Sequence, residues 1–213
     1  MTDFRKALDT HFRFMGENDH LPHGVKPRRV RQDGRTLLAR LMRDMEYRVG
    51  AEIGTRYGVS AKLWCETIPG LKLTCIDPYG VYRARHSQER QDAAYAGARE
   101  TLAPFDVTFL RESSVDVSDR FEDESLDFVN IDGDHAFNMV MQDILLYVPK
   151  VRPEGMILVH DYFPFYHGGV VQAVNAYTEC NLIRPWFTTR DMEPTAFWQK
   201  GSGKGGAGQL AEI

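Results

Sequence analysis

The sequence predicts an α/β fold built on one mostly parallel sheet with helices on both faces. Short apolar runs alternate along the chain with longer segments whose apolar residues recur at helical spacing. Turn-forming residues separate these segments. Strands that alternate with helices are typical of βαβ units, whose strands lie parallel in a single sheet.

Seven short apolar runs are predicted as strands. The first five cover residues 47–53, 71–76, 107–110, 126–131 and 156–159, and two closing strands are expected at 182–187 and 195–198. Helices are predicted between them from residue 36, at 61–68, in a segment that ends near Pro104, at 137–148 and at 170–177. The helix at 137–148 has the longest apolar face, and Asp143 is expected on its solvent side.

The domain organisation follows from these elements. Residues 1–35 are polar and basic, and are interpreted as a helix and loop that form an N-terminal appendage, a candidate substrate lid. Residues 36–200 form the predicted domain, and residues 201–213 a Gly-rich flexible tail. The basic residues that end at Arg35 are interpreted as a solvated face or as a group that holds an anionic substrate.

Composition narrows the class of protein. The chain has 213 residues, of which 43% are hydrophobic and 26% charged, as in ordinary globular enzymes. A formal net charge of -4 argues against a nucleic-acid binder with a broadly basic surface. The three cysteines lack metal-ligand spacing, which indicates a reduced cytoplasmic protein. The absence of a signal core and of a long apolar run predicts no membrane partner. Self-association into a homo-oligomer is left open.

Polar residues follow each of the first five predicted strands. In an open parallel sheet, ligands bind outside the carboxyl ends of the strands. In chain order these residues are Glu52, Gly54, Thr55, Gly58 and Ser60, then Asp77, then Ser113 and Ser114, then Asp132, Asp134 and His135, and finally His160 and Asp161. Their convergence predicts one ligand site at this edge of the sheet.

The glycine loop after the first strand indicates the kind of ligand. It lacks the Gly-x-Gly-x-x-Gly pattern of dinucleotide-binding loops, because Thr55, Arg56 and Tyr57 fill it. An acidic Glu52 suits a ligand that carries an ammonium group. The loop therefore favours S-adenosylmethionine over a dinucleotide, and Ser60 is expected to cap the following helix.

Four motifs together resemble a known family. Glu52-Ile-Gly-Thr-Arg-Tyr-Gly-Val-Ser60, Cys75-Ile-Asp-Pro78, Ile131-Asp-Gly-Asp-His135 and Val159-His-Asp-Tyr162 look like those of class I S-adenosylmethionine-dependent methyltransferases. They are most similar to the group with macrolide-sugar and rhamnosyl O-methyltransferases, and more distantly to catechol O-methyltransferase. The resemblance covers residues 47–177. It implies a Rossmann-like, seven-stranded sheet whose last strand, at 195–200, is antiparallel.

The resemblance also implies roles for the strand-end residues. Residues of the first loop, Glu52, Gly54, Thr55, Gly58 and Ser60, would line the methionine portion of the cofactor. Asp77 would bind the ribose, Ser113 and Ser114 the adenine, and Asp132 would face the methyl-transfer centre. In metal-dependent members a divalent cation lies at the positions of Asp132, His160 and Asp161. The imidazole of His160 departs from the usual acidic pair, and two carboxylates with one imidazole suit Mn²⁺ or Fe²⁺ somewhat better than Mg²⁺.

The chemistry of methyl transfer to a hydroxyl supports a cation and a base. A bound cation lowers the pKa of the acceptor hydroxyl, and a nearby imidazole can remove its proton. Because His135 follows Asp132 by three residues, both can face one cleft, and His135 is the predicted general base. Structural alternatives are a helix-pinning role for His135, a helix N-cap for Asp134 and a core histidine for His160.

The predicted function is therefore methylation of a hydroxyl on a small molecule, such as a sugar or a natural product. One alternative is a metal-independent N- or O-methyltransferase that uses the same pocket. Two alternatives come from other classes: a non-catalytic S-adenosylmethionine-binding regulatory protein and a NAD-dependent oxidoreductase. Acceptor specificity is expected from residues 1–35, 82–91 and 162–169.

Overall fold

The computed structural model describes residues 3–12, 34–81, 87–164, 168–184, 186–189 and 191–201. Within these ranges seven strands form one sheet in the order β3-β2-β1-β4-β5-β7-β6. The strands are β1 (Val49–Ile53), β2 (Lys72–Ile76), β3 (Val107–Leu110), β4 (Leu126–Ile131), β5 (Val151–Val159), β6 (Phe187–Thr188) and β7 (Ala196–Gln199). Neighbours from β3 to β5 pair in parallel, and β7 is antiparallel to both β5 and β6. The predicted Rossmann-like fold with an antiparallel last strand is confirmed.

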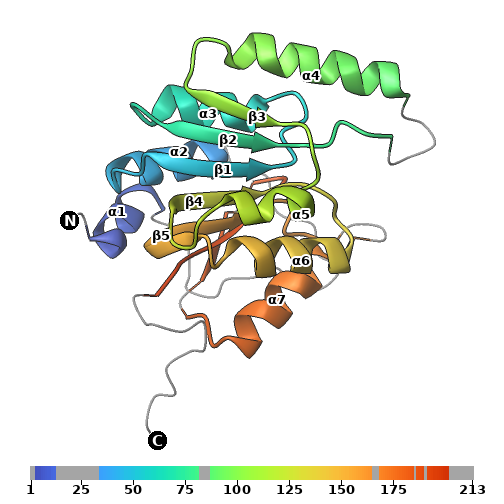
Figure 1. Cartoon of the computed structure of the whole chain (residues 1–213). Coiled ribbons are helices and arrows are strands. Elements are labelled where there is room, and N and C mark those ends of the chain that lie inside the picture. The colour runs from blue at the N-terminus through green and yellow to red at the C-terminus, as the bar shows by residue number, and fades with distance from the viewer. Residues whose placement is uncertain are drawn as a thin grey trace, which may run out of the picture.

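Helices cover both faces of this sheet (Figure 1). They are α1 (Phe4–His11), α2 (Gly34–Asp44), α3 (Val59–Thr67), α4 (Gln88–Leu102), α5 (Ser114–Val117), the 3-10 helix η1 (Ser118–Arg120), α6 (Phe137–Tyr147) and α7 (Val170–Cys180). One core cluster joins the sheet to α6 and α7, and a second joins it to α1, α2 and α3. No helix in the described part of the chain is long and apolar enough to cross a membrane.

The two clusters follow from the alternation of side chains along each strand. In β4, Phe128 belongs to the second cluster and Val129 to the first. In β1, Ala51 and Ile53 point into the first cluster, so Glu52 between them points toward the face that α3 covers. An ionisable side chain thus enters the sheet interior at the end of β1.

The described start of the N-terminal appendage packs against the domain. Phe12 is buried, with its ring centroid 5.5 Å from that of Phe197 in β7. His11 at the end of α1 lies 2.7 Å from the carboxylate of Asp44 at the end of α2. Residues 13–33 of the predicted lid lie outside the described residues, as do residues 202–213 of the predicted tail.

One predicted strand is wrong in extent. Residues 182–184 are not a strand, because they complete the turn after α7: Ile183 N–H donates to Thr178 O at 2.8 Å, and Leu182 has a φ of 51°. Only Phe187–Thr188 pairs with the sheet at this position, as β6. In the other direction, β5 begins at Val151, five residues before the predicted start at residue 156.

Candidate active site

The carboxyl ends of β1, β4 and β5 hold four ionisable side chains. The sheet ladder continues past these strands, because Asp132 N–H donates to Ile53 O and His160 N–H donates to Ile131 O, each at 2.9 Å. These bonds fix the backbone from which Asp132, His160 and Asp161 project beside Glu52. The order of the sheet therefore brings together residues that are up to 109 positions apart in the sequence.

Two histidines and two carboxylates form a compact cluster at this edge. His135 Nε2 lies 3.2 Å from Asp161 Oδ2. His160 Nδ1 lies 3.3 Å from Asp132 Oδ1 and 3.4 Å from Asp161 Oδ1. Asp161 has a φ of 59°, in the left-handed region that few non-glycine residues adopt. Such backbone strain persists where the surrounding structure holds it, and it is frequent at functional sites.

A cation-binding group can be formed from three of these residues. Among the described residues, Asp132, His135 and Asp161 each offer one ligand atom, and these atoms lie within 4.8 Å of one another. This group shares both carboxylates with the predicted metal set and has His135 where the prediction has His160. Oxygen and imidazole ligands of this kind suit divalent cations such as Mn²⁺.

His160 lies deeper than the two carboxylates. Its side chain is 6% exposed, and apart from the two contacts of Nδ1 with the carboxylates, its ring nitrogens have no hydrogen-bond partner among the described residues. Burial alone lowers the pKa of His160, but the charges of Asp132 and Asp161 outweigh it and raise the pKa to about 10. Contact with the two carboxylates therefore favours the protonated form of His160, and among the described residues no backbone carbonyl satisfies the ring as the core-histidine alternative requires.

Glu52 is the most deeply buried acid of the site. Its side chain is only 1% exposed, and among the described residues no donor meets Oε2 with hydrogen-bond geometry, although the Trp64 side chain lies close enough to lower the pKa of Glu52. Burial, and then the nearby charge of Asp132, raise the pKa of Glu52 well above its ordinary value. The buried hydroxyl of Thr55 likewise has no hydrogen-bond partner in the part of the chain that the structure describes. Buried polar atoms in folded proteins are nearly always hydrogen-bonded, so two unpartnered groups on one loop indicate a place for a polar ligand.

The backbone conformation of this loop requires glycine at two positions. Gly54 has a φ of 87°, and a Cβ there would lie 2.0 Å from the carbonyl oxygen of Asp132. Gly58 has a φ of 73° and is the N-cap of α3. The prediction that Ser60 caps this helix is wrong, because Ser60 lies inside the first turn. Its hydroxyl instead accepts a hydrogen bond from Arg35 Nη1 at 3.3 Å.

Asp77, at the end of β2, holds two loops together. Its oxygens accept hydrogen bonds from the N–H groups of Arg56 and Tyr79, each at 2.8 Å. Burial raises the pKa of Asp77, and these two bonds oppose the rise. A carboxylate has about four acceptor positions, so Asp77 can still accept hydroxyl donors. Tyr79 is buried and donates to Arg56 O, whereas Tyr57 is exposed.

Ser113 and Ser114 are engaged by protein groups. Ser113 is the N-cap of α5, where its hydroxyl accepts from Asp116 N–H. Ser114 donates to Asp143 Oδ1 at 2.5 Å. The prediction that Asp143 faces solvent is wrong, because its side chain packs against the start of α5 and is 3% exposed. Burial raises the pKa of Asp143 to about 6.

The turn before α6 differs from the prediction in one residue. Ala136, rather than Asp134, is the N-cap of α6. Asp134 stabilises the turn just before it, with Oδ1 accepting from Ala136 N–H at 2.7 Å. The carbonyl of His135 accepts from Gly169 N–H at 2.7 Å, which ties this turn to the start of α7. The His135 side chain is thus held toward Asp161 from a turn that is anchored on both sides.

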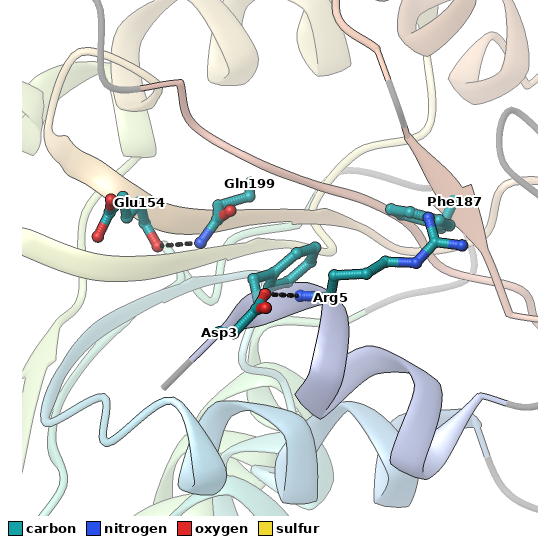
Figure 2. Close-up of a pocket in the computed structure, with 6 residues that line it drawn as sticks. Asp3, Arg5, Glu154, Phe187 and Gln199 are labelled. Carbon is teal, nitrogen blue, oxygen red and sulfur yellow. Dashed lines mark hydrogen bonds between the residues drawn. The ribbon is translucent and has the colours of Figure 1, made fainter. Parts of the chain in front are cut away.

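A hollow lies at the opposite, amino end of the parallel strands. Figure 2 shows it between the start of α1 and the strands β5, β6 and β7. Gln199 Nε2 donates to Glu154 O at 3.0 Å, and Asp3 Oδ1 accepts from Arg5 N–H at 2.9 Å. In both hydrogen bonds, donor and acceptor belong to the protein itself. The hollow also lies away from the strand ends that hold Asp132 and Asp161.

A protein-family model described as a methyltransferase domain matches residues 51–162. The uncharacterized protein y4gI of Sinorhizobium fredii is 27% identical over 171 residues, which are 78% of this chain but only 16% of that protein. This chain thus spans about a sixth of the length of that relative.

Two solved structures share the fold. One is the O-methyltransferase TomG from Streptomyces achromogenes, involved in tomaymycin synthesis and solved with S-adenosylmethionine (TM-score 0.60, 18% identity, 94% of this chain and 92% of that chain). The other is the O-methyltransferase from Bacillus cereus, in complex with S-adenosylhomocysteine (TM-score 0.59, 17% identity, 94% and 92%). Since the family model spans more than half of the chain and the sheet has the same architecture, this protein belongs to the methyltransferase domain family and has the class I methyltransferase fold.

Proposed function

We propose that the chain transfers a methyl group from S-adenosylmethionine to a hydroxyl group of a small molecule. The observation on which this rests is the buried, unpartnered Oε2 of Glu52 beside Asp132, within the segment that the methyltransferase family model matches. A buried carboxylate oxygen whose geometry leaves it without a hydrogen-bond partner among the described residues fits the ammonium group of the cofactor. The O-methyltransferases that share the fold support the choice of a hydroxyl acceptor.

The strand-end residues fit the other parts of the cofactor. Asp77 retains free acceptor positions for the ribose diol while its backbone bonds hold it in place. The adenine is proposed to lie near Ser113 and Ser114 after β3, whose hydroxyls bond to Asp116 and Asp143 and therefore leave the contact to their backbone or to neighbouring groups. The cofactor supplies an electrophilic methyl group on a sulfonium sulfur. The role of the protein is to hold the acceptor oxygen in line with it.

We propose that Asp132, His135 and Asp161 hold a divalent cation at the acceptor. Two carboxylates and an imidazole converge there, and burial, which raises the pKa of Asp161, is outweighed by its contacts with His160, which lower that pKa. The cation supplies Lewis-acid chemistry, which lowers the pKa of the acceptor hydroxyl. His160 then acts as a positioning residue, and His135 is a ligand in this arrangement.

The contact between His135 and Asp161 also favours a second arrangement. An imidazole oriented by a carboxylate is a typical general base. With Asp161 holding the ring, His135 can take the proton of the acceptor hydroxyl without a cation. This is the metal-independent form of the same activity. His135 is a metal ligand in the first arrangement and the general base in the second.

Calorimetry and chelation test these proposals in turn. Titration with S-adenosylhomocysteine is expected to show binding that Asp77→Ala weakens at least tenfold, with NAD as the comparison ligand. Binding of NAD alone would overturn the methyltransferase proposal. With an acceptor in hand, EDTA treatment separates the two arrangements: loss of turnover that Mn²⁺ restores supports the cation, and unchanged turnover supports His135 as base.

A further inference from the structure

Asp143 is a buried acid that neither proposed arrangement of the site uses. It lies on α6, and its side chain is 3% exposed. Burial is the main cause of its raised pKa, the hydrogen bond from Ser114 opposes the rise, and the charge of Asp134 adds to it. Burying a carboxyl group costs folding free energy, and residues with such a cost are commonly kept for function. We therefore looked for a role of Asp143 in the site beside it.

The first contact of Asp143 is with the residues that follow β3. Ser114 Oγ donates to Asp143 Oδ1 at 2.5 Å. One turn further along α6, the hydroxyl of Tyr147 donates to Ser114 O at 2.8 Å. α6 therefore holds Ser114 by its side chain and by its backbone. Ser113 is fixed as the N-cap of α5, so segment 112–114 is attached to the helices on this face of the sheet.

The same carboxyl group lies behind the turn that follows β4. A Cβ built on Gly133 would lie 3.6 Å from Asp143 Oδ2, which is ordinary van der Waals contact. Gly133 stands between Asp132 and Asp134 in the sequence, and the turn continues to His135. One side chain of α6 therefore reaches the loops of two different strands, one on the cofactor side and one on the side of the methyl acceptor.

The sheet itself does not position these two loops against each other. In the order β3-β2-β1-β4, two strands separate β3 from β4. Among the described residues, the backbone bonds of the sheet reach Leu110 O and Asp132 N–H, but they do not include residues 112–114 or 133–135. Asp143 thus provides a side-chain link where the ladder of backbone bonds has ended.

We propose that Asp143 is a positioning residue, which acts through Ser114 to keep segment 112–114 in register with the turn at Gly133. This inference rests on the proposed function, because it takes segment 112–114 as the place of the adenine. The hydroxyls of Ser113 and Ser114 are engaged, so the base is read by the backbone of this segment or by its neighbours. A displaced segment would misplace the contacts that distinguish adenine from other bases.

Calorimetry with two ligands tests this role. S-adenosylhomocysteine and S-inosylhomocysteine differ only in the purine, which is adenine in the first and hypoxanthine in the second. The unmodified protein is expected to prefer the adenine ligand. Asp143→Ala should reduce this preference about five- to tenfold, as for the loss of a buried hydrogen bond. Ser114→Ala removes the other partner of the same bond, so it should have a similar effect, and it decides the test if Asp143→Ala does not fold.

Two further variants separate this role from a general loss of structure. Asp143→Asn keeps an acceptor for Ser114 and should retain the preference for adenine. Gln142→Ala, at the exposed neighbouring position of α6, should change neither affinity.

Three results would overturn the inference. They are equal weakening of both ligands by Asp143→Ala with a lower melting temperature, which would assign Asp143 to packing alone, an unchanged preference, and an unmodified protein that binds both ligands equally well. An unmodified protein that binds neither ligand would instead contradict the proposed function. The two failures are therefore distinguishable.

Discussion

His135 Nε2 and Asp161 Oδ2 lie 3.2 Å apart, and this contact joins the turn after β4 to the end of β5. Both residues are held by backbone constraints, His135 by the bond from Gly169 and Asp161 by its left-handed conformation. A cation between them would replace the direct contact with two coordination bonds. A general base would keep it. The direct contact between His135 and Asp161 is therefore lost in the cation-bound arrangement and kept in the metal-independent one.

Cation binding is expected to stabilise the folded protein. A ligand that binds only the folded state adds about 2.7 kcal/mol at a hundredfold excess over its dissociation constant, which raises the melting temperature by several degrees. Mn²⁺ should produce this rise in the unmodified protein and in Asp119→Asn, an exposed control. His135→Ala and Asp161→Asn should abolish it. An equal rise in all four proteins would exclude the proposed ligands.

The sequence predicted the parallel part of the fold because buried parallel strands are uniformly apolar and end at polar turn residues. β3 and β4 match their predicted ranges. The closing strands were harder to place, because β6 has two residues and its position depends on pairing with β7. Because Asp132 and Asp161 follow neighbouring parallel strands, the sequence also predicted that they come together. Which of His135 and His160 lies deeper depends on side-chain packing, and the spacing of residues in the sequence does not determine it.

Gly54 tests how tightly the ends of β1 and β4 are packed. A Cβ at this position would collide with the carbonyl oxygen of Asp132 and occupy a strained φ of 87°. Gly54→Ala is therefore expected to lower the free energy of unfolding by about 3 kcal/mol or more. Gly97→Ala in α4 is the control, since a Cβ there meets nothing within 4 Å. It should stabilise the protein by about 0.5–1 kcal/mol in urea denaturation.

Asp143 should make stability depend on pH. Its pKa is about 6 in the folded protein against an ordinary 3.8, so the folded state binds more protons between these values. Stability therefore falls as the pH rises through this window. Asp143→Asn keeps an acceptor for Ser114 and removes the buried charge. At pH 8 its free energy of unfolding should exceed that of the unmodified protein by on the order of 1–3 kcal/mol, which a higher melting temperature would show. The gain should shrink at pH 4.5. A loss of stability at pH 8 would contradict this.

The burial of Asp143 does not follow from the helical periodicity of its segment. Along 137–148 the apolar residues mark one face, and a carboxylate outside that face is expected in solvent. The short helix α5, which is four residues long, has no such periodic signal. It covers this side of α6 and buries Asp143 through Ser114. The burial of one residue thus depended on an element too short to predict.

Phe12 tests whether the start of the chain is part of the folded domain. Its ring packs on Phe197 in β7, and its side chain is buried with Ala7 and Leu8 in the second core cluster. Phe12→Ala should lower the free energy of unfolding by about 3 kcal/mol, as truncation of a buried aromatic residue does. Asp9→Ala, at an exposed position of the same helix, should change it by less than about 0.5 kcal/mol. Equal effects would argue against a core role for α1.

Glu52 should affect stability and binding in opposite directions. Because burial and Asp132 raise its pKa, ionising Glu52 costs folding free energy, and stability falls as the pH rises through the folded-state pKa. Glu52→Gln removes that cost and should raise the melting temperature of the unliganded protein at pH 8. The same substitution takes the negative charge from the ammonium group, so it should weaken binding of S-adenosylhomocysteine at least tenfold.

Differential scanning fluorimetry and calorimetry on the same preparations measure both effects. A residue kept only for packing would lose stability on substitution and leave affinity unchanged. A residue kept for a ligand is tolerated in spite of its cost, which is a common feature of functional sites. Higher stability together with lower affinity would identify Glu52 as a ligand-binding residue. Lower stability with unchanged affinity would remove the observation on which the methyltransferase site is built, because the unpartnered carboxylate would then belong to the core.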